Sequence, residues 1–294
     1  MAKHSPDRQV LENAFSRRAA LRRLGVALAA VPLAKLFGCS SDSPASTDGP
    51  DSAVDDGDAG SPDASLPPDG GAQWASGGTA VMSGDYPDPF GALPAVCALA
   101  CATTLGPCYS GAIERRDISE GYPGLPVRLA FRVVDETCSP IEGAVVDIWH
   151  TRNSGLYSGT VDFCTSNDAD AESHLYFRGA QTTDANGRVD FDSCFPGWYP
   201  GRAVHIHFQI RIGAAEFVTS QLYFDEAVKA DIFATHPDYV SFGFPNRTNA
   251  MDGIFPIARP EDAIFEWTRQ TDGSMLASKT LVVRASLASP LCAA

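Results

Sequence analysis

Residues 203–224 read AVHIHFQIRIGAAEFVTSQLYF, and their pattern is the strongest indication of the fold class. Apolar side chains recur at alternate positions before and after Gly213, which is the periodicity of β-strands rather than of helices. The stretch therefore predicts two antiparallel strands, 203–212 and 217–224, that pair across a turn at Gly213.

The same alternation recurs outside this hairpin, from about residue 90 onward. Apolar side chains in 127–133 alternate with Arg128, Ala130 and Arg132, which predicts a half-buried strand. One helix is predicted over 225–236, with Asp225 as its N-cap. Three more strands, separated by turn residues, are predicted at 144–149, 189–191 and 280–284.

Many short strands, one short helix and long loops indicate an all-β protein, built as a β-sandwich or a barrel. A chain of 294 residues can form one large domain or two small ones. Since no internal repeat or second domain is evident, we predict a single domain over residues 76–294.

The chain is strongly acidic, with 22 Lys and Arg against 36 Asp and Glu, for a net charge of −14. This balance argues against nucleic-acid binding, which usually needs a basic face. No apolar run reaches the roughly 18 residues of a membrane-spanning helix. The basic residues are concentrated at the N-terminus, where residues 1–38 hold seven of the 22.

Residues 1–38 have the layout of an export signal, with a basic segment followed by a short apolar one over 24–38. The pair Arg17-Arg18 is typical of the twin-arginine type. Gly38 before Cys39 resembles a lipoprotein cleavage site. We therefore expect an exported protein, periplasmic or on the cell surface, tethered by lipid on Cys39. The alternative is an amphipathic N-terminal helix with a cysteine present by chance.

The segment that follows, 39–75, is rich in Asp, Ser, Pro and Gly and contains no Lys or Arg. Such a composition cannot bury enough apolar surface to fold, so we predict a disordered acidic tether.

Seven cysteines follow Cys39, and an oxidising compartment would allow up to three disulfides and one free thiol. The sequence does not give the pairing. Cys194 is expected in a disulfide. The cysteines are 97, 101, 108, 138, 164, 194 and 292.

The motif YPGRAVHIHF, residues 199–208, carries the strongest chemical signal. His205 and His207 lie two apart on a strand, so both imidazoles point to one face and can hold a metal ion together. From spacing alone, a pair of surface histidines is an equal alternative. The metal interpretation gains weight because Tyr199 precedes His205 by six residues, with Arg202 between them.

At this point the sequence resembles the intradiol ring-cleavage dioxygenases, a family of non-haem Fe(III) enzymes with a β-sandwich fold. The resemblance runs from about Gly106 to Phe224. Its segments are GP at 106–107, RDISEG at 116–121, GAVVDIWH at 143–150, GLYSG at 155–159, YFRG at 176–179, QTTD at 181–184, FPGWY at 195–199, HIHF at 205–208 and TSQLYF at 219–224.

The resemblance implies that iron is held by two tyrosinates and two histidines, namely Tyr157, Tyr199, His205 and His207. Phenolate oxygen is a hard anionic ligand that suits a hard ferric ion, whereas Fe(II) oxygenases use two His and a carboxylate. The implied reaction cleaves a catechol-type diol with O₂ between its hydroxylated carbons and gives a muconate-type diacid. Tyr199 would take up a substrate proton, Arg202 would stabilise negative charge that builds on the ring, and Gln221 would hydrogen-bond near the cleavage site.

Two alternatives differ in class from a dioxygenase. One is a non-catalytic, metal-containing β-sandwich module that binds aromatic or catecholate ligands. The other is a zinc protein that uses the two histidines with a cysteine. The identity of the catechol and the oligomeric state are left open by the sequence.

Overall fold

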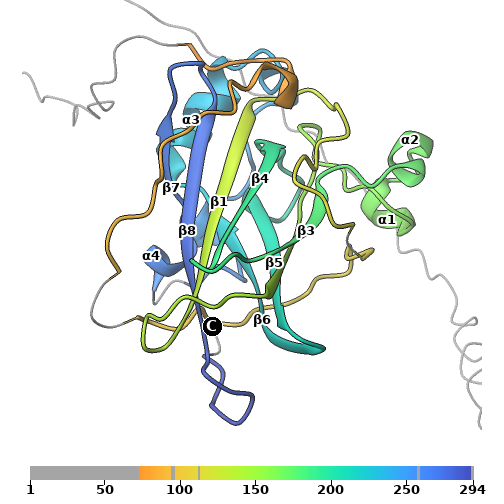
Figure 1. Ribbon diagram of the computed structural model, residues 1–294. Helices are drawn as coiled ribbons and strands as arrows, with labels where there is room; N and C mark the ends of the chain where they lie inside the picture. The colour runs from red at the N-terminus through yellow and green to blue at the C-terminus, as the bar shows by residue number, and fades with distance from the viewer. Residues whose placement is uncertain (1–72, 94–96, 112, 257–258, 293–294) are drawn as a thin grey trace, which may run out of the picture. The chain divides into compact units, whose positions relative to one another are not determined.

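The computed structural model describes residues 73–93, 97–111, 113–256 and 259–292. The predicted export signal, Cys39 and nearly all of the predicted tether lie outside these residues. The described part folds around two four-stranded sheets, which confirms the predicted all-β class (Figure 1). No helix in the described part is both long and apolar enough to span a membrane.

The first sheet has the strand order β4-β1-β8-β7. Its central strand β1 pairs antiparallel with β4 and parallel with β8, and β8 pairs antiparallel with the edge strand β7. The strands are β1 (Pro126–Asp135), β4 (Arg188–Cys194), β7 (Glu266–Arg269) and β8 (Met275–Val283).

The second sheet has the order β3-β2-β5-β6 and is antiparallel throughout. The predicted hairpin forms its β5–β6 half, and the turn lies at Gly213, whose φ of 60° is left-handed. The strands are β2 (Ala144–Trp149), β3 (Arg178–Thr182), β5 (His205–Ile212) and β6 (Ala215–Tyr223).

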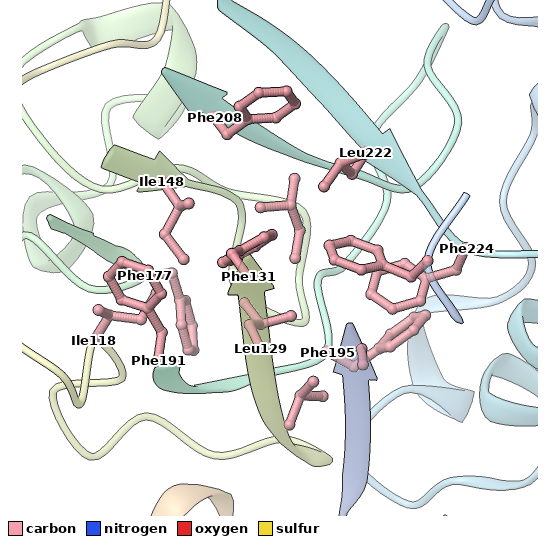
Figure 2. Packing of buried hydrophobic residues seen from close by; sticks show 14 of the residues in the cluster. Ile118, Leu129, Phe131, Ile148, Phe177, Phe191, Phe195, Phe208, Leu222 and Phe224 are labelled. Atoms are coloured by element: carbon pink, nitrogen blue, oxygen red, sulfur yellow. The ribbon is translucent and has the colours of Figure 1, made fainter. Parts of the chain in front are cut away.

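A hydrophobic core fills the space between the two sheets. Figure 2 shows Leu129 and Phe131 of β1 pointing toward Ile148, Phe208 and Leu222 of the second sheet. These side chains are at most 2% exposed. The apolar half of each alternating strand pattern therefore faces the opposite sheet, as expected for a sandwich.

The prediction that β1 is half-buried was wrong, because both of its faces are covered. Arg128 and Arg132 stand on the outer face, where Tyr86 and Phe90 of the N-terminal segment lie against their guanidinium groups, each 4.7 Å from ring centroid to Cζ. A segment about 40 residues away in the sequence supplies this cover, and the alternation within β1 does not reveal it.

The predicted helix is present as α3 (Glu226–Thr235), and the Asp225 side chain caps it by accepting a hydrogen bond from the amide of Val228 at 2.9 Å. Several short elements were not predicted. They are the edge strands β3 and β7, the helices α1 (Asp162–Thr165), α2 (Ala169–Ser173) and α4 (Pro260–Ala263), and the 3₁₀ turns η1 (Gly78–Val81), η2 (Val240–Phe242) and η3 (Asn249–Met251).

Ordered packing begins within the last residues assigned to the tether. The indole of Trp74 belongs to the core cluster and donates a hydrogen bond to Asp231 at 2.7 Å. The carbonyl of Ala75 lies 2.8 Å from His236 Nε2. The folded part therefore reaches at least two residues further toward the N-terminus than the predicted boundary at 76.

Three disulfides join described cysteines: Cys97–Cys138, Cys101–Cys292 and Cys108–Cys164. The expectation that Cys194 forms a disulfide was wrong, since it is the free thiol and is buried. Its Sγ lies against the carbonyl of Tyr122 at 3.5 Å.

Candidate metal centre

The site begins on the outer face of the second sheet, at the start of β5. His205 and His207 point to the same side, as their spacing predicts, and their Nε2 atoms lie 3.1 Å apart. Both rings are buried, each 3% exposed. The intervening Ile206 and its neighbours Val204 and Phe208 face the core. Strand alternation alone therefore places two imidazole nitrogens together.

Two tyrosines complete the cluster from loops. The hydroxyl oxygens of Tyr157, which follows β2, and Tyr199, which follows β4, each lie 3.3 Å from His205 Nε2. The two loops pack closely at Gly155, where a Cβ atom would come within about 2.0 Å of the carbonyl oxygen of Trp198. Glycine is required at this contact because any side chain would force the tyrosine loops apart.

The four donor atoms fit a single metal ion. Nitrogen and oxygen ligands bind ions such as zinc at about 2.0–2.2 Å, so neighbouring ligands on one ion lie roughly 3 Å apart, as these atoms do. The Nδ1 of His205 donates to the carbonyl of Ala203 at 2.6 Å, which leaves the Nε2 lone pair facing the cluster. Predicted ligands Tyr157, Tyr199, His205 and His207 are thus brought together.

Tyrosine is essential to this donor set. Among the described residues, no group of three or more His, Cys, Asp or Glu could hold a metal ion. Cys108 and Cys164, which pack near Tyr157, are joined in a disulfide. The described residues therefore give no support to a zinc site of two histidines and a cysteine.

Burial sets the charge of the cluster. Desolvation lowers the pKa of His205 to about 3, with Arg202 adding to the shift, and lowers the pKa of His207 well below its usual value. Desolvation likewise raises the pKa of Tyr157 and of Tyr199. Without a cation the four side chains are therefore neutral. A bound cation would reverse the preference of the tyrosines and stabilise their phenolates.

Arg202 and Gln221 lie next to the donors and contact each other. The Nη2 of Arg202 donates to Gln221 Oε1 and, at 3.3 Å, to the hydroxyl of Tyr223. Gln221 is paired with His207 across the β5–β6 hairpin. Arg202 and Gln221, the two residues predicted to act on the substrate beside the metal ligands, therefore form one hydrogen-bonded network next to the histidines.

Sequence reasoning missed Asp252, which anchors this network. Its buried carboxylate accepts hydrogen bonds from Arg202 Nε at 2.9 Å and from the backbone amides of Ala203 at 2.8 Å and Ile254 at 2.9 Å. Asp252 follows η3, 45 residues after His207, with no regular spacing to the motif. No pattern in the sequence points to it.

Three further residues of the matching segments lie on or near the second sheet, and two of them contact the cluster or its loops. The indole of Trp149 stacks on His207, with centroids 4.9 Å apart and planes 11° apart. Arg178 donates to the carbonyls of Cys108 and Ser158 and so holds two loops. His150 faces the other way, where it bonds Ser193 and stacks on Phe177.

A cleft of about 500 Å³ lies beside the donor cluster, and Tyr157 and Tyr199 form part of its wall. Its remaining wall comes from the segment around α1, from Trp198 and from η2. A small organic molecule bound in this cleft would therefore lie against both tyrosines.

Comparisons with known proteins agree with this geometry. A family model described as "Dioxygenase" matches residues 106–241, which contain all four donors, Arg202 and Gln221 but not Asp252. An intradiol ring-cleavage dioxygenase from Tetranychus urticae has a similar structure, with a TM-score of 0.59, 30% identity, and coverage of 66% of this chain and 98% of that one.

Curated relatives match over shorter stretches. A chlorocatechol 1,2-dioxygenase of Pseudomonas putida is 27% identical over 156 residues, or 46% of this chain and 56% of that protein. The protocatechuate 3,4-dioxygenase beta chain of Burkholderia cepacia is 31% identical over 117 residues, 37% of this chain and 48% of that one. The chain thus spans about half the length of the curated relatives it matches. The structural match at 30% identity, which covers 98% of the Tetranychus urticae dioxygenase, shows that this chain belongs to the intradiol ring-cleavage dioxygenase family.

Proposed function

We propose that this protein is a ferric dioxygenase that uses O₂ to cleave a catechol-type ring between its two hydroxylated carbons, giving a muconate-type diacid. The observation that carries the proposal is that the hydroxyl oxygens of two tyrosines and the Nε2 of His207 each lie 3.1–3.3 Å from His205 Nε2, at the wall of an open cleft. Family membership supports the reaction class.

Tyr157, Tyr199, His205 and His207 would hold the iron. Ferric iron bound there would coordinate the diol oxygens and make the ring reactive toward O₂. Two phenolates offset two of its three positive charges and favour ferric over ferrous iron, which suits a site that lacks carboxylate ligands among its described residues. The neutral histidines add no charge to this balance.

The surrounding side chains then have separate tasks. Tyr199 lies at the cleft, where its phenolate oxygen can accept a proton from the incoming diol. The guanidinium of Arg202, held by Asp252 and Gln221, provides a fixed positive charge beside the donors. A preorganised charge of this kind stabilises negative charge that develops on the ring.

The proposal is tested with full-length protein loaded with Fe(III). We expect a visible tyrosinate-to-iron charge-transfer band that shifts when catechol is added without oxygen. On admission of ¹⁸O₂ we expect one O₂ consumed per diol and two labelled atoms in the diacid. A shifting band without oxygen uptake would favour the non-catalytic binding module. A protein that stays colourless with Fe(III) would overturn both.

We also propose that the protein is exported and anchored by lipid on Cys39. Three disulfides among the described residues suit an oxidising compartment. Mass spectrometry of the mature protein from its native host should find a lipid-modified Cys39 at the N-terminus, and Cys39→Ser should release the protein from the membrane fraction. An intact N-terminus with unmodified Cys39 would contradict this.

A further inference from the structure

The cleft beside the two tyrosines is larger than a single-ring diol needs. Its volume is about 500 Å³, whereas a cavity of about 150 Å³ is enough to hold one benzene ring. A catechol placed against Tyr157 and Tyr199 would therefore leave most of the cleft empty. The remaining volume is large enough for a substituent attached to the diol ring.

The walls of the extra space are uncharged and mainly apolar, with Ser154 and Ser166 as the polar residues beside the two tyrosines. Phe163 of α1, Trp198, Phe242 of η2 and the Cys108–Cys164 disulfide contribute to them. None of the described residues that line the cleft carries a formal charge. A carboxylate buried here would lose its hydration without gaining a cation, which is costly.

The arginines close to the site do not supply that cation to the cleft. Arg178 is buried and donates to the carbonyls of Cys108 and Ser158. Arg202 is held by Asp252 and Gln221 on the side of the histidines. Neither side chain forms part of the cleft wall.

Two aromatic rings at the cleft remain in contact with water. Phe163 is 68% exposed and Phe242 is 40% exposed, although phenylalanine is normally buried. An apolar group packed against them in the cleft would remove their surface from water, and this burial would favour binding.

The backbone beside each ring is anchored before any ligand arrives. Phe163 precedes Cys164, which is joined by a disulfide to Cys108, and both cysteines line the cleft. Phe242 precedes Gly243, whose carbonyl accepts a hydrogen bond from the Trp198 indole at 3.0 Å. Walls fixed in this way bind with a smaller loss of conformational entropy.

From these observations we infer that the substrate is an uncharged catechol that carries an apolar arm at least as large as a second benzene ring, with Phe163 and Phe242 as the residues that select the arm. This inference deepens the proposed function and rests on it, because the diol end is placed by the proposed iron site.

The test compares four diols on the full-length, iron-loaded protein. Catechol and 4-phenylcatechol differ by the arm, while 4-methylcatechol and 3,4-dihydroxybenzoate differ by charge at similar size. We expect kcat/KM to be about tenfold higher for 4-phenylcatechol than for catechol, and at least tenfold lower for 3,4-dihydroxybenzoate than for 4-methylcatechol. Anaerobic calorimetric titrations measure the same two ratios as dissociation constants, independently of turnover.

Matched variants assign the preference to the two rings. Phe163→Ala and Phe242→Ala should each lower the 4-phenylcatechol-to-catechol ratio about tenfold. Phe244→Ala is the control, because Phe244 is 61% exposed but does not line the cleft, and it should leave the ratio unchanged. The thermal midpoint of each variant shows that it is folded.

The outcomes separate the two proposals. Equal kcat/KM and equal Kd for catechol and 4-phenylcatechol would overturn the inference about the arm while leaving the dioxygenase intact. So would a loss in Phe163→Ala that is the same for both diols. Failure to turn over any diol would count against the proposed function, and the titrations would still decide whether the cleft prefers the arm.

Discussion

The Asp252 carboxylate binds Arg202 and the residue that follows it at the same time: Oδ2 accepts from Arg202 Nε at 2.9 Å and from the amide of Ala203 at 2.8 Å. The side chain of Asp252 is fully buried. The amide that it binds, that of Ala203, lies two residues before His205, the first residue of β5. One carboxylate therefore fixes both the guanidinium and the start of the strand that carries the histidines.

Asp252→Asn should lower kcat about tenfold while iron content and KM change little, because Arg202 loses its charged partner and no longer keeps one orientation. Steady-state kinetics and metal analysis check this together. Asp192→Asn is the control, since Asp192 pairs with Arg128 in the other sheet. An Asp252→Asn enzyme with unchanged kcat would show that Arg202 does not need this anchor.

Tyr157→Phe should bind far less iron and lose the visible charge-transfer band, since phenylalanine supplies no oxygen to the cluster. Metal analysis and an absorption spectrum after Fe(III) loading measure both effects. Tyr86→Phe is the matched control, because Tyr86 bonds Asp272 and Ser274 away from the donors. Iron content equal to wild type in Tyr157→Phe would remove Tyr157 from the ligand set.

The Cys108–Cys164 disulfide should matter for iron binding as well as for stability. The amide of Tyr157 donates a hydrogen bond to the carbonyl of Cys164, so the disulfide fixes the loop that carries this predicted ligand. Changing both cysteines to serine should lower the free energy of unfolding by about 4 kcal/mol for a loop of this length. It should also weaken iron binding.

The matched control is the double serine variant of Cys101 and Cys292, whose disulfide closes a longer loop but does not line the cleft. It should lose comparable stability and retain iron affinity. Urea unfolding and an iron titration measure the two quantities separately. Equal iron affinity in both double variants would disconnect the Cys108–Cys164 bridge from the site.

His150 should make the metal-free protein sensitive to acid. Burial lowers the pKa of His150 to about 4, whereas an unfolded histidine titrates near 6.5. Below pH 6.5 the unfolded state takes up a proton that the folded state refuses, so stability falls as the pH drops from about 6.5 to about 4. The full loss is about 3 kcal/mol.

His150→Gln removes this titration and keeps a side chain that can bond Ser193. The difference in unfolding free energy between pH 7.5 and pH 5 should therefore be smaller in the metal-free variant than in metal-free wild type. Because both proteins retain His205 and His207, the comparison isolates His150. Identical pH dependence would mean that His150 does not contribute.

Local pattern was sufficient for the hairpin and its histidines, because strand alternation fixes which side chains share a face. The same rule gave α3, whose cap at Asp225 is local. It could not reveal α1 or α2, since a helix of four or five residues contains little more than one turn of its period. Similarly, β7 has only four residues.

The other features that the sequence did not predict depend on contacts between segments that are distant in the chain. The cover over β1 by Tyr86 and Phe90, the pairing of cysteines that leaves Cys194 free, and the anchor at Asp252 all depend on the folded topology. Tyr157 and Tyr199 were predicted as ligands through the family resemblance, because neither loop has a spacing of its own that points to the histidines.

The alternation along β5 separates two kinds of requirement within eight residues. Odd positions such as His205 and His207 serve the site, while even positions such as Ile206 and Phe208 serve the core. Substitutions at Ile206 or Phe208 can therefore be tested for their effect on thermostability without changing a side chain of the candidate site. A single inserted residue before His205 would exchange the two sets, because register in a strand has period two. Length variation among natural or engineered homologues should therefore accumulate in the turn at Gly213 and be absent from 205–208.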